Sequence, residues 1–160
     1  NYPASGMCSP TRACFAGGRQ HPSYYNTIDY ITMSTQGNAA DFGDLTEPRA
    51  FATQGITSNS VRGITAGGYA VPAYYNYIDY ITIPTLGNAT DFGDLLSVRG
   101  SSMGVTSPTR CVVIGGAAPA YTDVIQYVQI MTTGNAVDFG DMHTQITAWG
   151  AGASNGHGGL

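Results

Sequence analysis

A nine-residue segment recurs three times, as GNAADFGDL at residues 37–45, GNATDFGDL at 87–95 and GNAVDFGDM at 134–142. A repeat at a nearly fixed interval of about 50 residues indicates a chain built from tandem structural units. A glycine pair keeps the same step, at Gly17-Gly18, Gly67-Gly68 and Gly115-Gly116. The sequence therefore predicts one unit copied three times, and function has to be sought where the copies differ.

The repeat divides the 160 residues into a single module with the following parts. Residues 1–9 resemble the end of a preceding repeat, and residues 154–160 form a C-terminal closing segment. The three copies are expected at residues 10–58, 59–107 and 108–153. The chain has no initiator methionine, so we expect either a processed product or part of a longer protein.

Charge is scarce in this chain. Only 10% of the residues are charged, lysine is absent and the net charge is −4, whereas an average soluble domain has roughly 25% charged residues. Nucleic-acid binding needs a basic surface, so this class of partner is excluded. No apolar run approaches the roughly 18 residues of a membrane span, so a membrane partner is not expected either.

The second copy predicts four short strands and no helix. Residues 60–68 form a buried strand that ends at the glycine pair, and residues 69–76 form a loop. Residues 77–85 carry apolar side chains on both faces, as an interior strand does. Residues 87–95 are a turn followed by a third strand, and residues 96–107 contain a fourth strand and the link to the next copy. The fold class is therefore predicted to be all-β.

Four antiparallel strands per unit describe one blade of a β-propeller. The glycine pair and the later Arg49 and Arg99 resemble the kelch repeat, although Ile146 replaces the arginine in the third copy. Phenylalanines stand where kelch repeats carry tryptophan, at Phe42, Phe92 and Phe139. The resemblance implies a kelch-like propeller.

Three blades are too few, since propellers close with about four or more. Two chains could complete a six-bladed ring as a homo-oligomer, or further blades could lie upstream in a longer chain. The alternative is a fold that closes at three units, a β-trefoil or a β-prism.

The segments Asn26–Thr35 with Gly37–Leu45, and Asn76–Thr85 with Gly87–Leu95, resemble the repeats of virion proteins of tailed phages of marine bacteria. The ending SNGHGGL is similar to the C terminus of such proteins. This resemblance implies a virion, extracellular location and contact with other virion subunits. It favours a structural or adhesive module of a tail or fibre, with a host-surface glycan as a further partner.

The segment after each glycine pair is where the copies differ most. It reads RQHPSYYN, YAVPAYYN and AAPAYTD, and is expected to be a loop on one face of the molecule. Tyrosine rings are rigid and amphipathic, which suits the binding of glycans and proteins. The predicted ligand-binding residues are Tyr24, Tyr25, Tyr74, Tyr75 and Tyr121. The alternative is that the second tyrosine of each pair packs between units.

Two further sets of repeated residues are predicted to be structural. The aspartates of the DFGD motif are expected to build turns, with calcium binding as the alternative: Asp41, Asp44, Asp91, Asp94, Asp138 and Asp141. The arginines before each apolar strand are expected to pair with a repeated aspartate, with an anion-binding ring as the alternative: Arg12, Arg62 and Arg110.

The sequence offers no catalytic set. The histidines share no spacing, and no serine or cysteine has an identifiable base, so we expect no enzyme, no cofactor and no metal. Cys14 and Cys111 are predicted to be buried thiols in apolar strands. The remaining function hypotheses are a carbohydrate-binding lectin of three-fold fold and, less favoured, a propeller-type glycosidase that uses Asp29 and Asp79.

Overall fold

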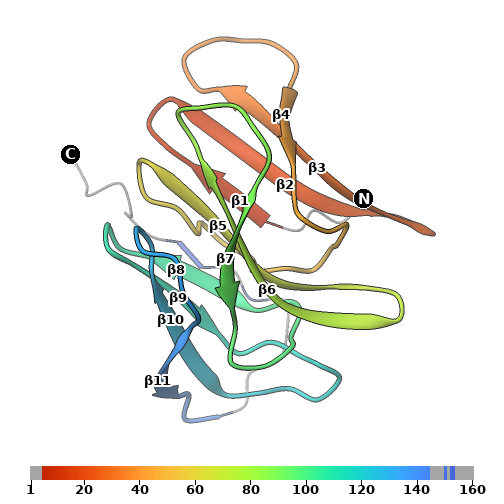
Figure 1. Ribbon diagram of the computed structural model, residues 1–160, viewed down its shortest axis with the longest axis vertical. Helices are drawn as coiled ribbons and strands as arrows, with labels where there is room; N and C mark the ends of the chain where they lie inside the picture. Colours follow the sequence, from red (N-terminus) through yellow and green to blue (C-terminus); the bar gives the residue numbers. More distant parts are fainter. Residues whose placement is uncertain (1–4, 145–149, 151, 154–160) are drawn as a thin grey trace.

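The computed structural model describes residues 5–144, 150, 152 and 153, and it consists of three antiparallel sheets that follow one another along the chain. Figure 1 shows the sheets in chain order, from the orange first sheet at the top to the blue third sheet at the bottom. The described residues contain no helix, so the all-β prediction is confirmed. Accordingly, they offer no helix of the length and apolar character that crossing a membrane requires.

The strands run in simple meanders, each paired with its neighbour in sequence. The first sheet contains β1 (Ser5–Cys8), β2 (Arg12–Gln20), β3 (Ser23–Thr32) and β4 (Ala40–Asp44). The second contains β5 (Arg62–Ala70), β6 (Ala73–Thr82) and β7 (Thr90–Asp94). The third contains β8 (Met103–Thr106), β9 (Arg110–Ile114), β10 (Val124–Gln129) and β11 (Val137–Asp141).

Residues 53–58 lie beside β5, in the place that β1 and β8 take in the other sheets. The amide of Ile64 donates to the carbonyl of Thr57 at 2.8 Å, and Ser58 bridges Gly63. Neighbouring inner segments run parallel, through bridges between Gly6 and Ile56 and between Gln54 and Met103. The three inner segments therefore lie in one row, with a sheet extending from each.

The predicted limits of the copies do not match the sheets. The strand expected within residues 96–107 is β8, but β8 pairs with β9 of the third copy. Likewise β1, assigned to a preceding repeat, pairs with β2. The reason is a tight connection, in which the amide of Ser107 donates to the carbonyl of Arg110 at 2.8 Å and closes a local hairpin. The closing segment 154–160 lies outside the described residues.

The glycine pair does not end its strand, which corrects the prediction. The register of β5 on β6 shifts between Ala66 and Gly68, and Gly67 has a φ of 65°. This is a β-bulge, where glycine supplies the left-handed backbone and the strand then continues. As a result β5 reaches Ala70, and the connection to β6 is only the two residues Val71 and Pro72. The tyrosines predicted in a loop at 69–76 therefore lie on strands.

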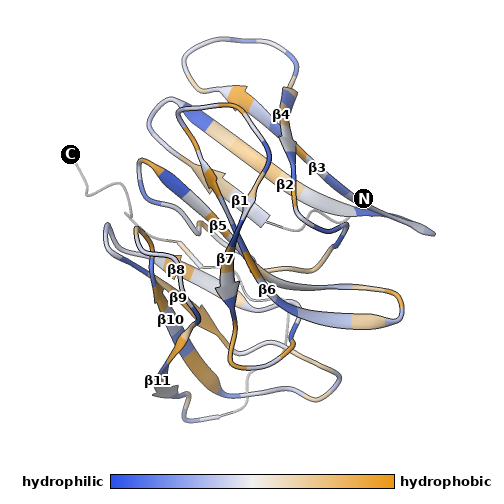
Figure 2. Ribbon diagram, viewed as in Figure 1, coloured by the Kyte–Doolittle hydropathy of each residue, from blue (hydrophilic) through white to orange (hydrophobic). Residues whose placement is uncertain are grey.

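The core lies between the sheets. One apolar cluster joins the first sheet to the second, and another joins the second to the third. Figure 2 shows apolar residues along strands of all three sheets. Among the described residues neither cluster joins the first sheet to the third, and the sheets do not form the closed barrel of a β-trefoil, whereas the β-prism alternative stays a prediction.

Both predicted buried thiols lie in these clusters, since Cys14 and Cys111 are fully buried. Desolvation raises the pKa of Cys14 to about 11 and that of Cys111 to about 12. Both thiols are therefore protonated at neutral pH and pack as small apolar side chains.

Candidate functional site

The recurring segment forms the junctions between sheets. At the first junction, the amides of Gly87 and Ala89 donate to the carbonyls of Phe42 and Asp44 at 2.9 and 2.7 Å. The side-chain oxygen of Asn88 accepts from the amide of Asp44 at 3.1 Å. The second junction repeats all three bonds with Gly134, Asn135 and Ala136 on Phe92 and Asp94. The GNA part of each copy thus docks on the DFGD part of the preceding copy.

This docking gives the repeated asparagine a role between sheets, and its partners are backbone atoms of Asp44 and Asp94. The six aspartates lie in the outer strands β4, β7 and β11: Asp41, Asp44, Asp91, Asp94, Asp138 and Asp141. The asparagine caps a strand of the neighbouring sheet rather than its own turn. Among the residues that the structure describes, no three histidine, cysteine, aspartate or glutamate side chains are grouped to hold a metal ion.

The repeated arginines do not pair with aspartate, so that prediction is wrong. The guanidinium carbon of Arg12 lies 5.0 Å from the ring centroid of Tyr30, and Nη1 donates to the carbonyl of Ile83 in the next sheet at 2.8 Å. Arg62 repeats both contacts, over Tyr80 and with the carbonyl of Ile130 at 3.3 Å. Arg110 lies over Tyr127. A tyrosine ring on the adjacent strand holds each guanidinium by a cation–π contact.

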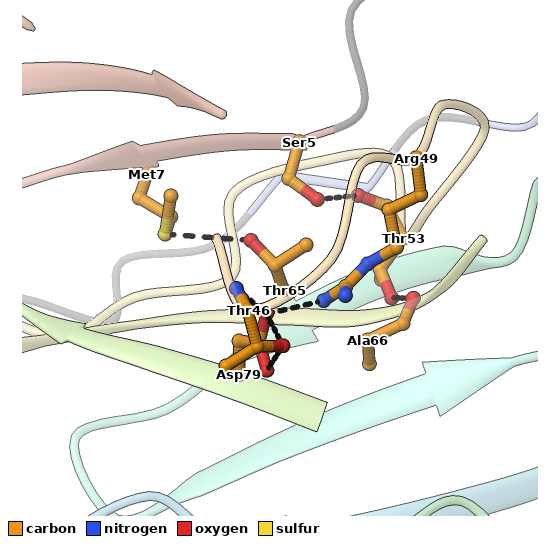
Figure 3. A network of polar contacts seen from close by, with 8 residues as sticks. All are labelled: Ser5, Met7, Thr46, Arg49, Thr53, Thr65, Ala66 and Asp79. Carbon is orange, nitrogen blue, oxygen red and sulfur yellow. Dashed lines mark hydrogen bonds and ion pairs between the residues drawn. The ribbon is translucent and has the colours of Figure 1, made fainter. Parts of the chain in front are cut away.

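One ion pair is found in the described part of the chain, and it crosses the first junction. Arg49 Nη2 lies 2.8 Å from Asp79 Oδ2, with 0% and 1% of the two side chains exposed. The amide and hydroxyl of Thr46 also donate to the Asp79 carboxylate (Figure 3). Asp79 is therefore a structural residue of the junction.

The second junction has glutamine where the first has aspartate. The side-chain oxygen of Gln126 accepts from the amide of Leu96 at 2.8 Å. Arg99, the counterpart of Arg49, donates instead to the carbonyl of Gly115 at 3.2 Å. Burial lowers the pKa of the Arg99 guanidinium. Because Arg99 is bonded to Gly115 and not to the residue at this position, the neutral side chain of Gln126 is sufficient as the acceptor.

A hollow lined by tyrosines lies where the β5–β6 hairpin meets the third sheet. Its volume is about 340 Å³. The lining consists of Phe51, Tyr69, Tyr74, Gly100, Ser101, Ala117, Pro119 and Tyr121. Tyr69 and Tyr74 are cross-strand partners with ring centroids 4.7 Å apart, so they form one aromatic wall. Tyr121, 49% exposed, forms part of the rim.

The backbone around the hollow is held by cross-links between loops. Gly100 and Ala117 exchange two hydrogen bonds, at 2.8 and 2.9 Å. Ser101 and Phe51 both have a φ of 55°, in the left-handed region that is rare for residues other than glycine. The amide of Ser101 donates to the carbonyl of Phe51, which fixes this uncommon backbone shape beside the hollow. Such strain tends to occur at functional sites.

The structure brings together two of the five predicted ligand-binding tyrosines, Tyr74 and Tyr121. Tyr24 lies next to the wall, with its ring centroid 6.1 Å from that of Tyr69. Tyr25 and Tyr75 are not in the lining. Each follows the first tyrosine of its pair on a strand, so it points to the other face of the sheet. Tyr75 stacks on Tyr77, with ring centroids 5.3 Å apart.

Sequence analysis missed Tyr69, which forms half of the aromatic wall. The segment YAVPAYYN contains the signal, because a two-residue turn at Val71-Pro72 places Tyr69 opposite Tyr74. The described residues of the lining offer apolar rings, phenolic hydroxyls and the hydroxyl of Ser101, and none of them is a carboxylate or a histidine. Such a surface can stack on a sugar ring and hydrogen-bond its hydroxyls.

Comparison with known proteins adds no relative: no family model matches the chain, and a search of curated proteins finds no match.

Proposed function

We propose that the chain is a non-enzymatic structural and adhesive module whose tyrosine-lined hollow binds a carbohydrate. The observation that carries the proposal is the convergence of Tyr69, Tyr74 and Tyr121 on one hollow, whose described lining has no charged side chain. Glycan sites use aromatic faces together with hydroxyl groups, and this lining supplies both. The glycan of a host cell surface is the proposed ligand.

The three sheets are, in this proposal, blades of a kelch-like propeller in a phage virion protein of a tail or fibre. The meander of each sheet and the parallel row of inner segments support the propeller architecture. The virion, extracellular location rests on the resemblance of the repeated segments. Binding residues are often on loops that a rigid scaffold positions, which suits adhesion.

Binding rather than catalysis is favoured by the chemistry around the hollow. A glycosidase needs two carboxylates that flank the bond to be cleaved. Asp79 is buried in its ion pair with Arg49, and Asp29 is exposed on another sheet. Neither aspartate belongs to the lining, so no geometry supports the glycosidase alternative. The lectin alternative has the same binding function as this proposal and differs from it only in the fold.

The test is a pair of substitutions in the hollow. We expect Tyr74→Ala combined with Tyr121→Ala to abolish binding on a glycan array that includes bacterial surface polysaccharides. The thermal melt should remain nearly unchanged, because Tyr121 is exposed and Tyr74 half-buried. Tyr25→Ala, 45% exposed and outside the lining, is the matched control and should bind as the unchanged chain does. Equal binding by all three proteins would refute the proposal.

A further inference from the structure

The two end sheets expose, at opposite ends of the row, the two halves of the contact that is buried at the junctions. Phe42 and Phe92 are 3% and 2% exposed inside the junctions, whereas their counterpart Phe139 in the third sheet is 55% exposed. Ile83 belongs to the other half of the first junction and is fully buried. Its counterpart in the first sheet, Met33, is 58% exposed. Among the described residues, each end of the row therefore presents a half-junction without its partner.

The third-sheet end is the acceptor half. A Cβ atom added to Gly43 would lie 2.5 Å from the carbonyl oxygen of Gly87, and one added to Gly93 would lie 2.6 Å from Gly134. These glycines form the shallow cradle that receives the next turn. Gly140, at the same position in β11, has nothing within 4 Å of such a Cβ. In the part of the chain that the structure describes, nothing fills this third cradle.

The first-sheet end is the donor half. Its turn, Gly37-Asn38-Ala39, has the same sequence as the two turns that dock inside the molecule, and all three residues are exposed. At the internal junctions, Asn88 and Asn135 cap the amides of Asp44 and Asp94. Asn38 offers the same side-chain oxygen to solvent.

We propose that the third sheet of one molecule docks on the first sheet of a second copy, with the geometry of the internal junctions. Gly37 and Ala39 donate to the carbonyls of Phe139 and Asp141, and Asn38 caps the amide of Asp141. Phe139 packs against Met33 and Phe15, which is 46% exposed. The contact is head-to-tail, so it closes into a ring or extends as a filament.

The arginine contact of the internal junctions also has its donor and its acceptor on the two end sheets. Arg12 and Arg62 donate across the internal junctions to the carbonyls of Ile83 and Ile130. Arg110, held over Tyr127 in the third sheet, has the same place on the open face. Its acceptor in the second copy is the carbonyl of Met33. All five contacts of a junction, namely two backbone hydrogen bonds, the asparagine cap, the phenylalanine packing and the arginine contact, thus have their partners on the two end sheets.

Asp29 is the one weak point of this contact. It corresponds to Asp79, which faces Arg49, but the third copy has Ile146 in the arginine position and that residue lies outside the described part. The amide of His143 takes the place of the Thr46 amide. At the second junction, Gln126 accepts from the equivalent amide of Leu96 without an arginine. We therefore expect Asp29→Gln to tighten the association about tenfold, because it removes a carboxylate buried without a cation.

Sedimentation velocity of the full chain over a range of concentrations tests the proposal. We expect concentration-dependent association, and monomers for the single variants Phe139→Asp and Met33→Asp, whose changes lie on exposed side chains. The two variants mixed together should form a 1:1 dimer, because each retains the half that the other has lost. Val71→Asp, at a 64% exposed position on the β5–β6 turn, is the matched control and should associate normally.

Three results would overturn the proposal: a chain that stays monomeric throughout, variants that do not complement each other, or an Asp29→Gln chain that associates no more tightly. Failure of complementation would point to a symmetric contact instead. The readout is independent of the tyrosine hollow, so its outcome and that of the glycan experiment can be separated. A variant that lacks Tyr74 and Tyr121 should associate as the unchanged chain does.

Discussion

Arg49 joins two sheets through a single carboxylate. Its Nη2 atom is bonded to Asp79, while Nε and Nη1 are buried without a hydrogen-bond partner. A buried guanidinium has a high desolvation cost, which the ion pair offsets only if the carboxylate stays in place. The position is therefore sensitive to the loss of either partner, although the pair itself need not add net stability.

We predict that Arg49→Ala lowers the free energy of unfolding by about 3–5 kcal/mol, because it leaves the Asp79 charge buried with only the Thr46 donors. Urea denaturation followed by tyrosine fluorescence measures the change. The control is Asp29→Ala, measured at protein concentrations that keep the chain monomeric, which alters the same position of the repeat where it is exposed and should cost no more than about 0.5 kcal/mol. Similar losses for the two variants would contradict the role given to the buried pair.

The glycine of the DFGD motif is needed for backbone conformation in every outer strand, but for close packing only where another sheet docks. Gly93 and Gly140 share the DFGD motif and similar backbone angles, with φ of 142° and 130°. Any side chain strains this backbone, so both positions carry that cost. Only at Gly93 does the backbone of the neighbouring turn occupy the place of a Cβ.

Gly93→Ala is therefore expected to lower the free energy of unfolding by about 1–3 kcal/mol more than Gly140→Ala does, since overpacking adds to the shared strain. Thermal or urea unfolding of the two variants at low protein concentration gives the difference directly. Equal losses of unfolding free energy for the two variants would show that the close approach of Gly134 to Gly93 does not contribute to stability.

The sequence was sufficient to predict strands, their approximate positions and the three-fold repeat. Hydrophobic alternation and turn residues are local signals, and the structure confirms them. The limits of each strand were harder, because a glycine pair reads equally as a stop or as a bulge, and only the pairing of Ala66 and Gly68 with β6 decides between them.

Contacts between sheets were the part that the sequence could not supply. The pairing of Arg12 with Tyr30 and with a carbonyl of the next sheet depends on how two sheets face each other. No spacing along the chain encodes that angle. The tyrosine hollow was found only in part for the same reason, since Tyr121 and Tyr74 come from different sheets.

For the whole molecule, stability lies at the junctions. Each apolar cluster contains residues from two adjacent sheets, so a sheet on its own would leave one face of its core exposed. Stability in such a row is a sum over nearest neighbours, as in other repeat proteins. The end sheets, with one junction each, are expected to open before the central one.

We predict that Phe92→Ala costs about 3–5 kcal/mol of unfolding free energy, because it leaves a cavity at the second junction. Phe139→Ala removes the same side chain from an exposed position and, at protein concentrations that keep the chain monomeric, should cost less than about 1 kcal/mol. Hydrogen exchange adds a spatial check, with protection lost first in β9 and β10 of the Phe92 variant. Loss spread evenly over β2 and β3 would contradict independent junctions.

Because every copy carries both a turn that docks and a cradle that receives, the gene can gain or lose whole copies by recombination between its matching segments. A protein shortened or lengthened in this way keeps an intact junction between every two neighbouring copies that remain. The number of sheets in the row, rather than the chemistry of its binding site, is then the property that selection can change most quickly.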